Sequence, residues 1–162
     1  MNNFPGIALN EDDSHYYFTR AGKELNEEIV ASFVDQYTNT QVTDLILNPN
    51  CMRTSYASKV WDPIWLGYDP DGSDDQPLLA STAPESRTGC RNWIHTAWKL
   101  HQMGIDPYAL WIDRARKYGI NPWISMRMND IHNVDDEKSF IHSEFWRENP
   151  QFRRIPYEFK AW

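Results

Sequence analysis

The sequence predicts an α/β fold in which parallel strands alternate with helices. Three short apolar runs, at residues 6–10, 42–48 and 121–132, have the length and composition of buried strands. Helical patterns separate these runs, at residues 26–37 and again across residues 91–118. A strand, a helix and a further strand in that order indicate parallel strands with the helices packed outside them.

The first strand and helix are marked by their ends. The apolar run at residues 6–10 stops at Asn10 and leads into an acidic loop. The helix at residues 26–37 begins at Asn26, a residue that suits the N-cap, and two glutamates and an apolar stripe follow it. The second strand, at residues 42–48, is stopped by a proline.

A long loop insertion is expected at about residues 50–90. Prolines, glycines and aspartates punctuate it too often for regular structure, and a loop of this length inside a domain is usually functional. Two helices follow. The first, at about residues 91–103, stops at Gly104, and the second runs from Pro107 to its stop at Gly119. One more short helix is expected near the C-terminal end, at Ser143–Glu148.

The third strand is predicted to deliver polar groups at its carboxyl end. Apolar and polar side chains alternate along residues 121–132, so the two kinds face opposite sides of the sheet. An arginine on the inner face is costly unless it is paired or solvated, so this face should line a polar cleft. The side chains expected in the cleft are Ser125, Arg127 and Asn129, and those expected toward the helices are Ile124, Met126 and Met128.

The three predicted strands end alike, with an apolar residue followed by asparagine. Asn10, Asn48 and Asn129 should therefore point away from the helices, and in a barrel of parallel strands that side is the lumen, whose carboxyl rim holds active sites. A simpler explanation also stands, because asparagine is a turn former that ends strands well.

The chain resembles bacterial glycoside-hydrolase-like (β/α)8 barrel proteins. The resemblance is carried by Ala-Arg-Lys-Tyr-Gly-Ile-Asn-Pro-Trp-Ile-Ser-Met-Arg-Met-Asn-Asp-Ile-His at residues 115–132 and by Ser-Glu-Phe-Trp-Arg-Glu-Asn-Pro at residues 143–150. It is specific across residues 107–150 and loose across residues 6–50. It implies a carbohydrate-active hydrolase that cleaves O-glycosyl bonds, with a carbohydrate substrate and no cofactor.

The resemblance also implies an incomplete barrel. A full barrel takes roughly 250 residues, so residues 1–162 are expected to form a single incomplete (β/α)8-type domain with about three βα units. The catalytic carboxylates of such hydrolases would then lie beyond Trp162. The expected partners are a carbohydrate and either a second copy of the chain or a completing segment, because open strand edges invite pairing.

The expected site residues come from the strand ends and the loop. Arg127 is expected to bind a substrate carboxylate, a catalytic carboxylate or a structural partner. Asp130 is a weak candidate for a catalytic acid and is more simply expected to orient His132 or Arg127. His132 suits hydrogen bonds to sugar hydroxyls, proton transfer or a metal, although no ligand spacing supports a metal site. The substrate-binding candidates are Arg127, Asn129, His132, Asn48, Asn10 and Trp61.

Composition narrows the function classes. A net charge of −7 and a pI near 5.1 argue against nucleic-acid binding. No apolar run approaches the roughly 20 residues that span a bilayer, and no signal peptide is recognisable, so a cytoplasmic location and secretion after signal removal both stay open. Pairing of Cys51 with Cys90 is also open. Two other functions remain: a non-catalytic carbohydrate-binding or scaffold protein, and a metal-dependent hydrolase on the same barrel.

Overall fold

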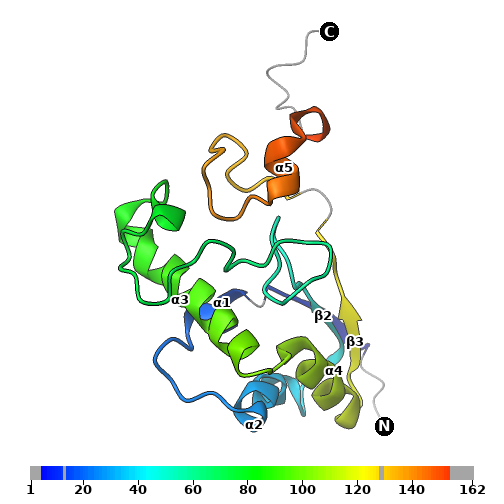
Figure 1. Ribbon diagram of the computed structural model, residues 1–162. Coiled ribbons are helices and arrows are strands. Elements are labelled where there is room, and N and C mark those ends of the chain that lie inside the picture. The colour runs from blue at the N-terminus through cyan, green and yellow to red at the C-terminus, as the bar shows by residue number, and fades with distance from the viewer. Residues whose placement is uncertain (1–4, 13, 128–129, 154–162) are drawn as a thin grey trace, which may run out of the picture.

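The computed structural model describes residues 5–12, 14–127 and 130–153. In this part the chain is an α/β structure built on a small parallel sheet, with most of its helices lying to one side of the strands (Figure 1). The predicted α/β class with parallel strands is therefore confirmed. None of the helices in the described ranges is long and apolar enough to cross a membrane.

The sheet contains three strands that pair in the order of the sequence. β2 lies between the other two and is parallel to both. This is the order that consecutive βα units produce when each crossover places the next strand beside the last. The strands are β1 (Ile7–Glu11), β2 (Val42–Leu47) and β3 (Asn121–Ile124).

Helices occupy the connections, and one further short helix follows the sheet. The connection from β1 to β2 carries three short helical segments, and that from β2 to β3 carries the two longest helices of the described chain. The segments in chain order are α1 (Ser14–Phe18), α2 (Glu27–Ala31), the 3-10 segments η1 (Ser32–Tyr37) and η2 (Pro77–Leu79), α3 (Pro84–Gln102), α4 (Pro107–Lys117), α5 (Glu144–Glu148) and the 3-10 segment η3 (Pro150–Phe152).

The ends of the helices follow the predicted signals. The Asn26 side chain accepts a hydrogen bond from the backbone N–H of Ile29 at 2.8 Å, which caps α2. Its continuation beyond Ala31 is a 3-10 segment, so the predicted helix at residues 26–37 is present in two forms. Gly104 and Gly119 have positive φ angles of 71° and 74° directly after α3 and α4, where a left-handed residue ends a helix.

Two helices differ from the sequence prediction. α1 was expected to be loop, yet Tyr16 and Tyr17 in it are fully buried in the core. α3 begins at Pro84, several residues before the predicted start at about residue 91. A proline in this stretch was interpreted as a loop signal, but proline also suits the first turn of a helix because its missing N–H is not needed there.

β3 is shorter than predicted and ends at Ile124, although a strand was expected through residue 132. Its neighbour β2 ends at Leu47, whose carbonyl still accepts a hydrogen bond from the N–H of Ser125 at 2.8 Å. Beyond that point the described residues offer the chain after β3 no neighbouring strand. Ile124 and Met126 are correspondingly 45% and 40% exposed, so the apolar alternation does not continue into a buried face there. Met128 and Asn129 lie outside the described residues.

The core lies between the sheet and the helices. Leu45 and Leu47 of β2 are completely buried against it, and so is Trp111 of α4. The indole N–H of Trp111 donates to the carbonyl of Val30 at 2.8 Å, which ties α4 to α2 without leaving a buried donor unpaired. The core is rich in aromatic rings, and Trp111 packs edge-on against Tyr16.

The opposite face of the sheet is open. Ile46 is in register with Asn10 on β1 and with Trp123 on β3, so these three side chains share that face. Trp123 is 57% exposed, and its indole N–H donates to Asp44 at 2.9 Å. Parallel sheets are ordinarily covered on both faces, so this open face is unusual.

Candidate functional site

A cavity of about 240 Å³ lies at the carboxyl ends of the three strands. Asp12 follows β1, Asn48 and Asn50 follow β2, and Arg127 follows β3, and all four line the cavity. Side chains delivered by parallel strands meet at this edge because all three strands point the same way. The predicted polar cleft at the strand ends is therefore present among the described residues.

An aromatic wall faces these polar groups. Trp93 of α3 and Phe140 line the cavity, and their ring centroids lie 6.0 Å apart in an edge-to-face arrangement. The indole N–H of Trp93 donates to the hydroxyl of Ser55 in the long loop at 3.1 Å. This hydrogen bond fixes the indole at the cavity wall.

Asn10 and Asn48 come together as their positions predicted, but only one of them lines the cavity. The amide of Asn48 donates to the side-chain oxygen of Asn10 at 2.8 Å and to the carbonyl of Glu11 at 2.7 Å. Asn48 is 7% exposed and lines the cavity, whereas Asn10 is exposed and is not among the lining residues. Asn10 therefore orients Asn48; it lies on the sheet face opposite the core, as expected, but outside this cavity. Asn129, the third predicted asparagine, lies outside the described residues.

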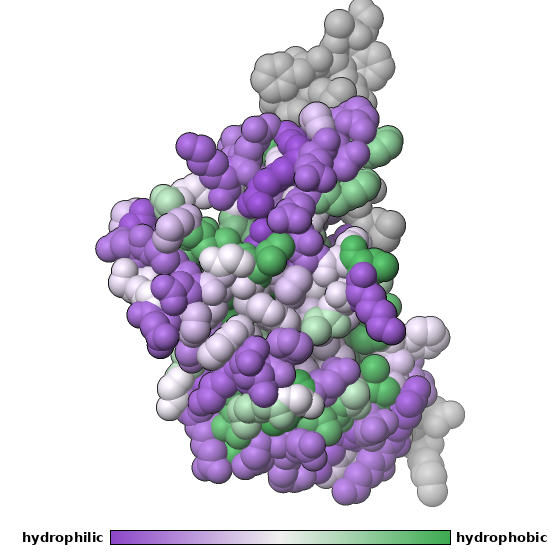
Figure 2. Space-filling model, viewed as in Figure 1, coloured by the Kyte–Doolittle hydropathy of each residue, from purple (hydrophilic) through white to green (hydrophobic). Residues whose placement is uncertain are grey.

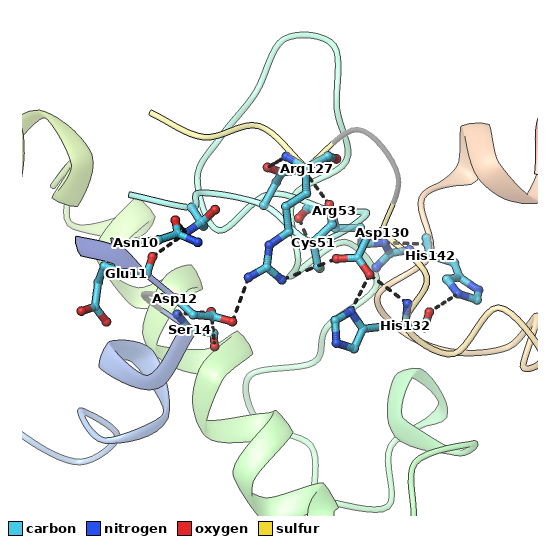
Figure 3. A network of polar contacts seen from close by, with 12 residues as sticks. Asn10, Glu11, Asp12, Ser14, Cys51, Arg53, Arg127, Asp130, His132 and His142 are labelled. Carbon is cyan, nitrogen blue, oxygen red and sulfur yellow. Dashed lines mark hydrogen bonds and ion pairs between the residues drawn. The ribbon is translucent and has the colours of Figure 1, made fainter. Parts of the chain in front are cut away.

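The guanidinium of Arg127 lies between two carboxylates (Figure 3). Its Nη2 donates to Oδ2 of Asp12 at 2.9 Å, and its Nη1 is 3.6 Å from Oδ2 of Asp130. The predicted pairing of Arg127 is thus supplied from within the chain, by the segments that follow β1 and β3. This arrangement favours a structural and orienting role for Arg127 over the capture of a substrate carboxylate.

Asp130 orients both Arg127 and His132. Its side chain is 2% exposed, and its Oδ1 accepts from the backbone N–H of His132 at 2.9 Å and lies 2.5 Å from Nδ1 of the imidazole. The imidazole of His132 is 67% exposed and lines the cavity. The contact through Nδ1 leaves Nε2 of His132 turned away from Asp130, where it is free to meet a ligand.

The two carboxyl groups around Arg127 are both held in the ionised form. Burial raises the pKa of Asp12, but hydrogen bonds from Arg127 and Ser14 outweigh it, so the pKa lies below its ordinary value. Burial likewise raises the pKa of Asp130, and contacts with His132 and Arg127 again outweigh it and lower the pKa. A carboxyl group that donates a proton near neutral pH needs a raised pKa, so neither group suits that role.

His142 is buried and does not join Asp130. Its Nε2 lies 3.3 Å from the carbonyl of His132, and its ring packs at a tilt of 33° against Trp146, with centroids 3.7 Å apart. Burial lowers the pKa of His142. Within residues 5–12, 14–127 and 130–153, no three or more histidine, cysteine, aspartate or glutamate side chains are arranged to hold a metal ion.

Two of the tryptophans line cavities. Trp93 packs against the core on one side and lines the cavity at the strand ends. Trp61 was expected at the sugar site, but it lines a neighbouring cavity that shares Arg127 and Cys51 with the first. The sequence held one signal for the position of Trp93. Cys90 and Trp93 are three residues apart on α3, so their side chains lie on the same face of the helix, and both line the cavity.

Cys51 and Cys90 both line the cavity and carry free thiols. Burial raises the pKa of Cys51 to about 11 and also raises that of Cys90. Both are therefore protonated at neutral pH and behave as small apolar groups in the cavity wall.

Comparison with known proteins adds no relative. No protein-family model matches the chain, and no curated protein matches it. The functional argument therefore depends on the geometry of the cavity.

Proposed function

We propose that the chain binds a carbohydrate in the cavity at the strand ends, as the substrate-binding part of a glycoside-hydrolase-like (β/α)8 protein. One observation carries this proposal: polar side chains from all three strand ends meet an aromatic wall around one cavity. Sugars offer hydroxyl groups that bind amides and carboxylates, and apolar ring faces that pack on aromatic rings. Asn48 and His132 suit the hydroxyl groups, and Trp93 suits the ring face.

The barrel architecture is part of the proposal. Consecutive parallel strands, crossover helices on one face and a polar site at the carboxyl ends are the features of a (β/α)8 barrel. The open face with Asp44 and Trp123 would then be the inner side of the barrel. A parallel sheet needs cover on that side, which further chain would supply.

The electrostatics favour a neutral sugar. Arg127 is the cation nearest the centre of the site, and it is already paired with Asp12 and Asp130. An anionic sugar would have to displace one of these carboxylates and would meet the other at short range. Neutral hydroxyl groups, in contrast, can bind without disturbing the pairs.

Catalysis requires a proton donor that the described residues do not supply at this cavity. Glycoside hydrolysis uses two carboxyl groups, one of which is protonated when it acts. Asp12 and Asp130 both have lowered pKa values, and both are engaged by Arg127. We therefore expect the 162-residue chain to bind sugar without turning over aryl glycosides. Turnover by the purified chain would contradict this assignment of the two carboxylates.

A non-catalytic carbohydrate-binding protein is the second candidate. The same two ionised, paired carboxylates favour it, because they suit hydrogen-bond acceptance better than acid catalysis. Both candidates share the same sugar site and differ in whether carboxylates from elsewhere complete it.

A binding screen tests the proposal. The purified chain would be applied to an array of neutral monosaccharides and oligosaccharides, and the best ligand would be titrated by calorimetry. We expect binding by the wild type and a loss of about tenfold or more in Trp93→Phe, which keeps an aromatic ring but loses indole area and the hydrogen bond to Ser55. Absence of binding to every sugar, with the protein folded, would contradict the proposal.

A further inference from the structure

A second cavity, of about 280 Å³, adjoins the one at the strand ends. The two cavities share Cys51 and Arg127, and Asp130 lines only the second of them. Each volume is below the roughly 300 Å³ at which ligand sites begin, but together they fall within that range. The shared side chains place the two cavities next to each other.

The far wall of the second cavity is aromatic and exposed. Phe145 of α5 and Phe152 of η3 are 62% and 71% exposed, and both line the cavity. Their rings are nearly parallel, with an interplanar angle of 8° and centroids 6.2 Å apart. Figure 2 shows hydrophobic residues at the surface beside α5, on a face that is otherwise largely hydrophilic there. The two exposed rings give this wall apolar surface on which the face of a sugar ring can pack.

The aromatic wall of the second cavity is held rigidly. Trp146 lies between the imidazole of His142, at 3.7 Å, and the guanidinium of Arg153, at 4.0 Å. Arg153 also donates to the carbonyls of Trp146 and Arg147 at 2.9 and 2.7 Å, which joins η3 to α5. A wall that is already ordered loses little conformational entropy when a ligand binds.

An unsatisfied acceptor lies between the two cavities. The side chain of Asp130 is 2% exposed, yet its Oδ2 accepts no hydrogen bond from the described residues, and the nearest cation to this atom is Arg127 Nη1 at 3.6 Å. Buried polar atoms are ordinarily hydrogen-bonded, so such an atom indicates a missing partner. The carboxylate of Asp130 therefore contributes a buried negative charge to the wall of the second cavity.

We propose that the second cavity is a further sugar-binding site and that the protein takes an oligosaccharide. The chain of sugar rings would extend from Trp93 past Arg127 and Asp130 to the aromatic pair. This inference rests on the proposed function, because it assigns the length of the ligand that the first cavity begins to bind. Phe145 and Phe152 then determine specificity for chain length.

Titration of a length series tests the inference. The probe is a neutral monosaccharide that binds the first cavity, together with its linear oligomers of two to four rings. We expect affinity to rise about tenfold or more with length and then level off. Phe145→Ala should lower affinity for the longest oligomer about tenfold, the size expected for loss of an aromatic contact, and leave monosaccharide affinity unchanged.

The matched control is Trp123→Ala, which removes another exposed aromatic ring from the open face of the sheet, outside both cavities. It should leave the whole length series unchanged. Equal affinity for all lengths, or equal losses in Phe145→Ala and Trp123→Ala, would overturn the second site and leave the first site standing. Failure of every sugar to bind would overturn both.

Discussion

The side chain of Asn50 pairs with the backbone of Arg127 as a neighbouring strand would. Its Oδ1 accepts from the Arg127 N–H at 3.0 Å, and its Nδ2 donates to the Arg127 carbonyl at 3.2 Å. β2 has already ended at Leu47, so this amide replaces the strand partner that the chain after β3 no longer has. The pairing places Arg127 at the cavity, where its side chain reaches Asp12 and Asp130.

Removal of this amide should lower stability and sugar affinity together. Asn50 is 4% exposed, so Asn50→Ala leaves two backbone groups of Arg127 without their partner, at a cost of about 1–3 kcal/mol in free energy of unfolding. Urea denaturation measures the first effect and calorimetry the second. The control is Gln102→Ala, which removes an exposed amide at the end of α3. Stability unchanged in Asn50→Ala would show that the pairing contributes nothing.

The extent of β3 shows what the sequence pattern could not supply. The alternation of apolar and polar residues predicted a strand through residue 132. Alternation indicates which face each residue prefers, but it does not indicate where the neighbouring strand ends. The strand stops at Ile124 because β2 stops at Leu47. The polar side chains after β3 were nevertheless predicted. An arginine on the inner face of a strand costs free energy unless it is paired or solvated, and this holds wherever the strand ends.

The sequence indicated the cavity residues that follow the strands, but it did not indicate those that come from the long loop. Asn48, Arg127 and His132 were predicted from their position after apolar runs, and all three line the cavity. Ser55 and Cys51 were missed because no periodicity places a loop residue. Trp61, another loop residue, lines the second cavity.

Acid should destabilise the protein through Asp130, and Arg127→Ala should shift that effect to higher pH. The pKa of Asp130 in the folded protein lies below its ordinary value, so the unfolded chain takes up the proton first as pH falls. The stabilisation is complete above the unfolded pKa of about 3.9 and is lost as pH falls through the folded pKa. Arg127→Ala removes one of the contacts that lower the pKa of Asp130, while those with His132 remain, so this pKa rises and stability begins to fall at higher pH.

Urea denaturation between about pH 3 and pH 7 measures this shift. Arg127→Ala should also cost about 1–3 kcal/mol at neutral pH, because it leaves a buried carboxylate without its cation. Arg116→Ala removes an arginine of α4 that is 68% exposed and serves as the control. Identical acid profiles for Arg127→Ala and the wild type would contradict the role of Arg127.

Alkylation should distinguish the two cysteines. Cys90 is half-buried and Cys51 is buried with a pKa of about 11, so iodoacetamide at pH 8 should modify Cys90 slowly and Cys51 more slowly still. Because both thiols line the cavity, saturating sugar should protect Cys90. Mass spectrometry of tryptic peptides measures both rates. Modification of Cys90 at the same rate with and without bound sugar would count against the cavity as the sugar site.

The open face of the sheet should promote self-association. Trp123 is 57% exposed on that face, and β3 is an edge strand among the described elements. Unpaired edges and uncovered parallel sheets favour pairing with another copy. Light scattering should therefore give a mass above the 19.1 kDa of one chain, and Trp123→Lys should lower it. A monodisperse wild-type monomer would contradict this expectation.

The central claim is that the cavity at the strand ends holds a sugar ring against Trp93. A crystal structure of the chain soaked with its best-binding sugar tests this most directly. The account predicts a ring packed on the Trp93 indole, with hydroxyl groups bonded to Asn48 and to His132 on the opposite side. A sugar bound outside this cavity, or a cavity that stays empty at saturating sugar, would contradict the account.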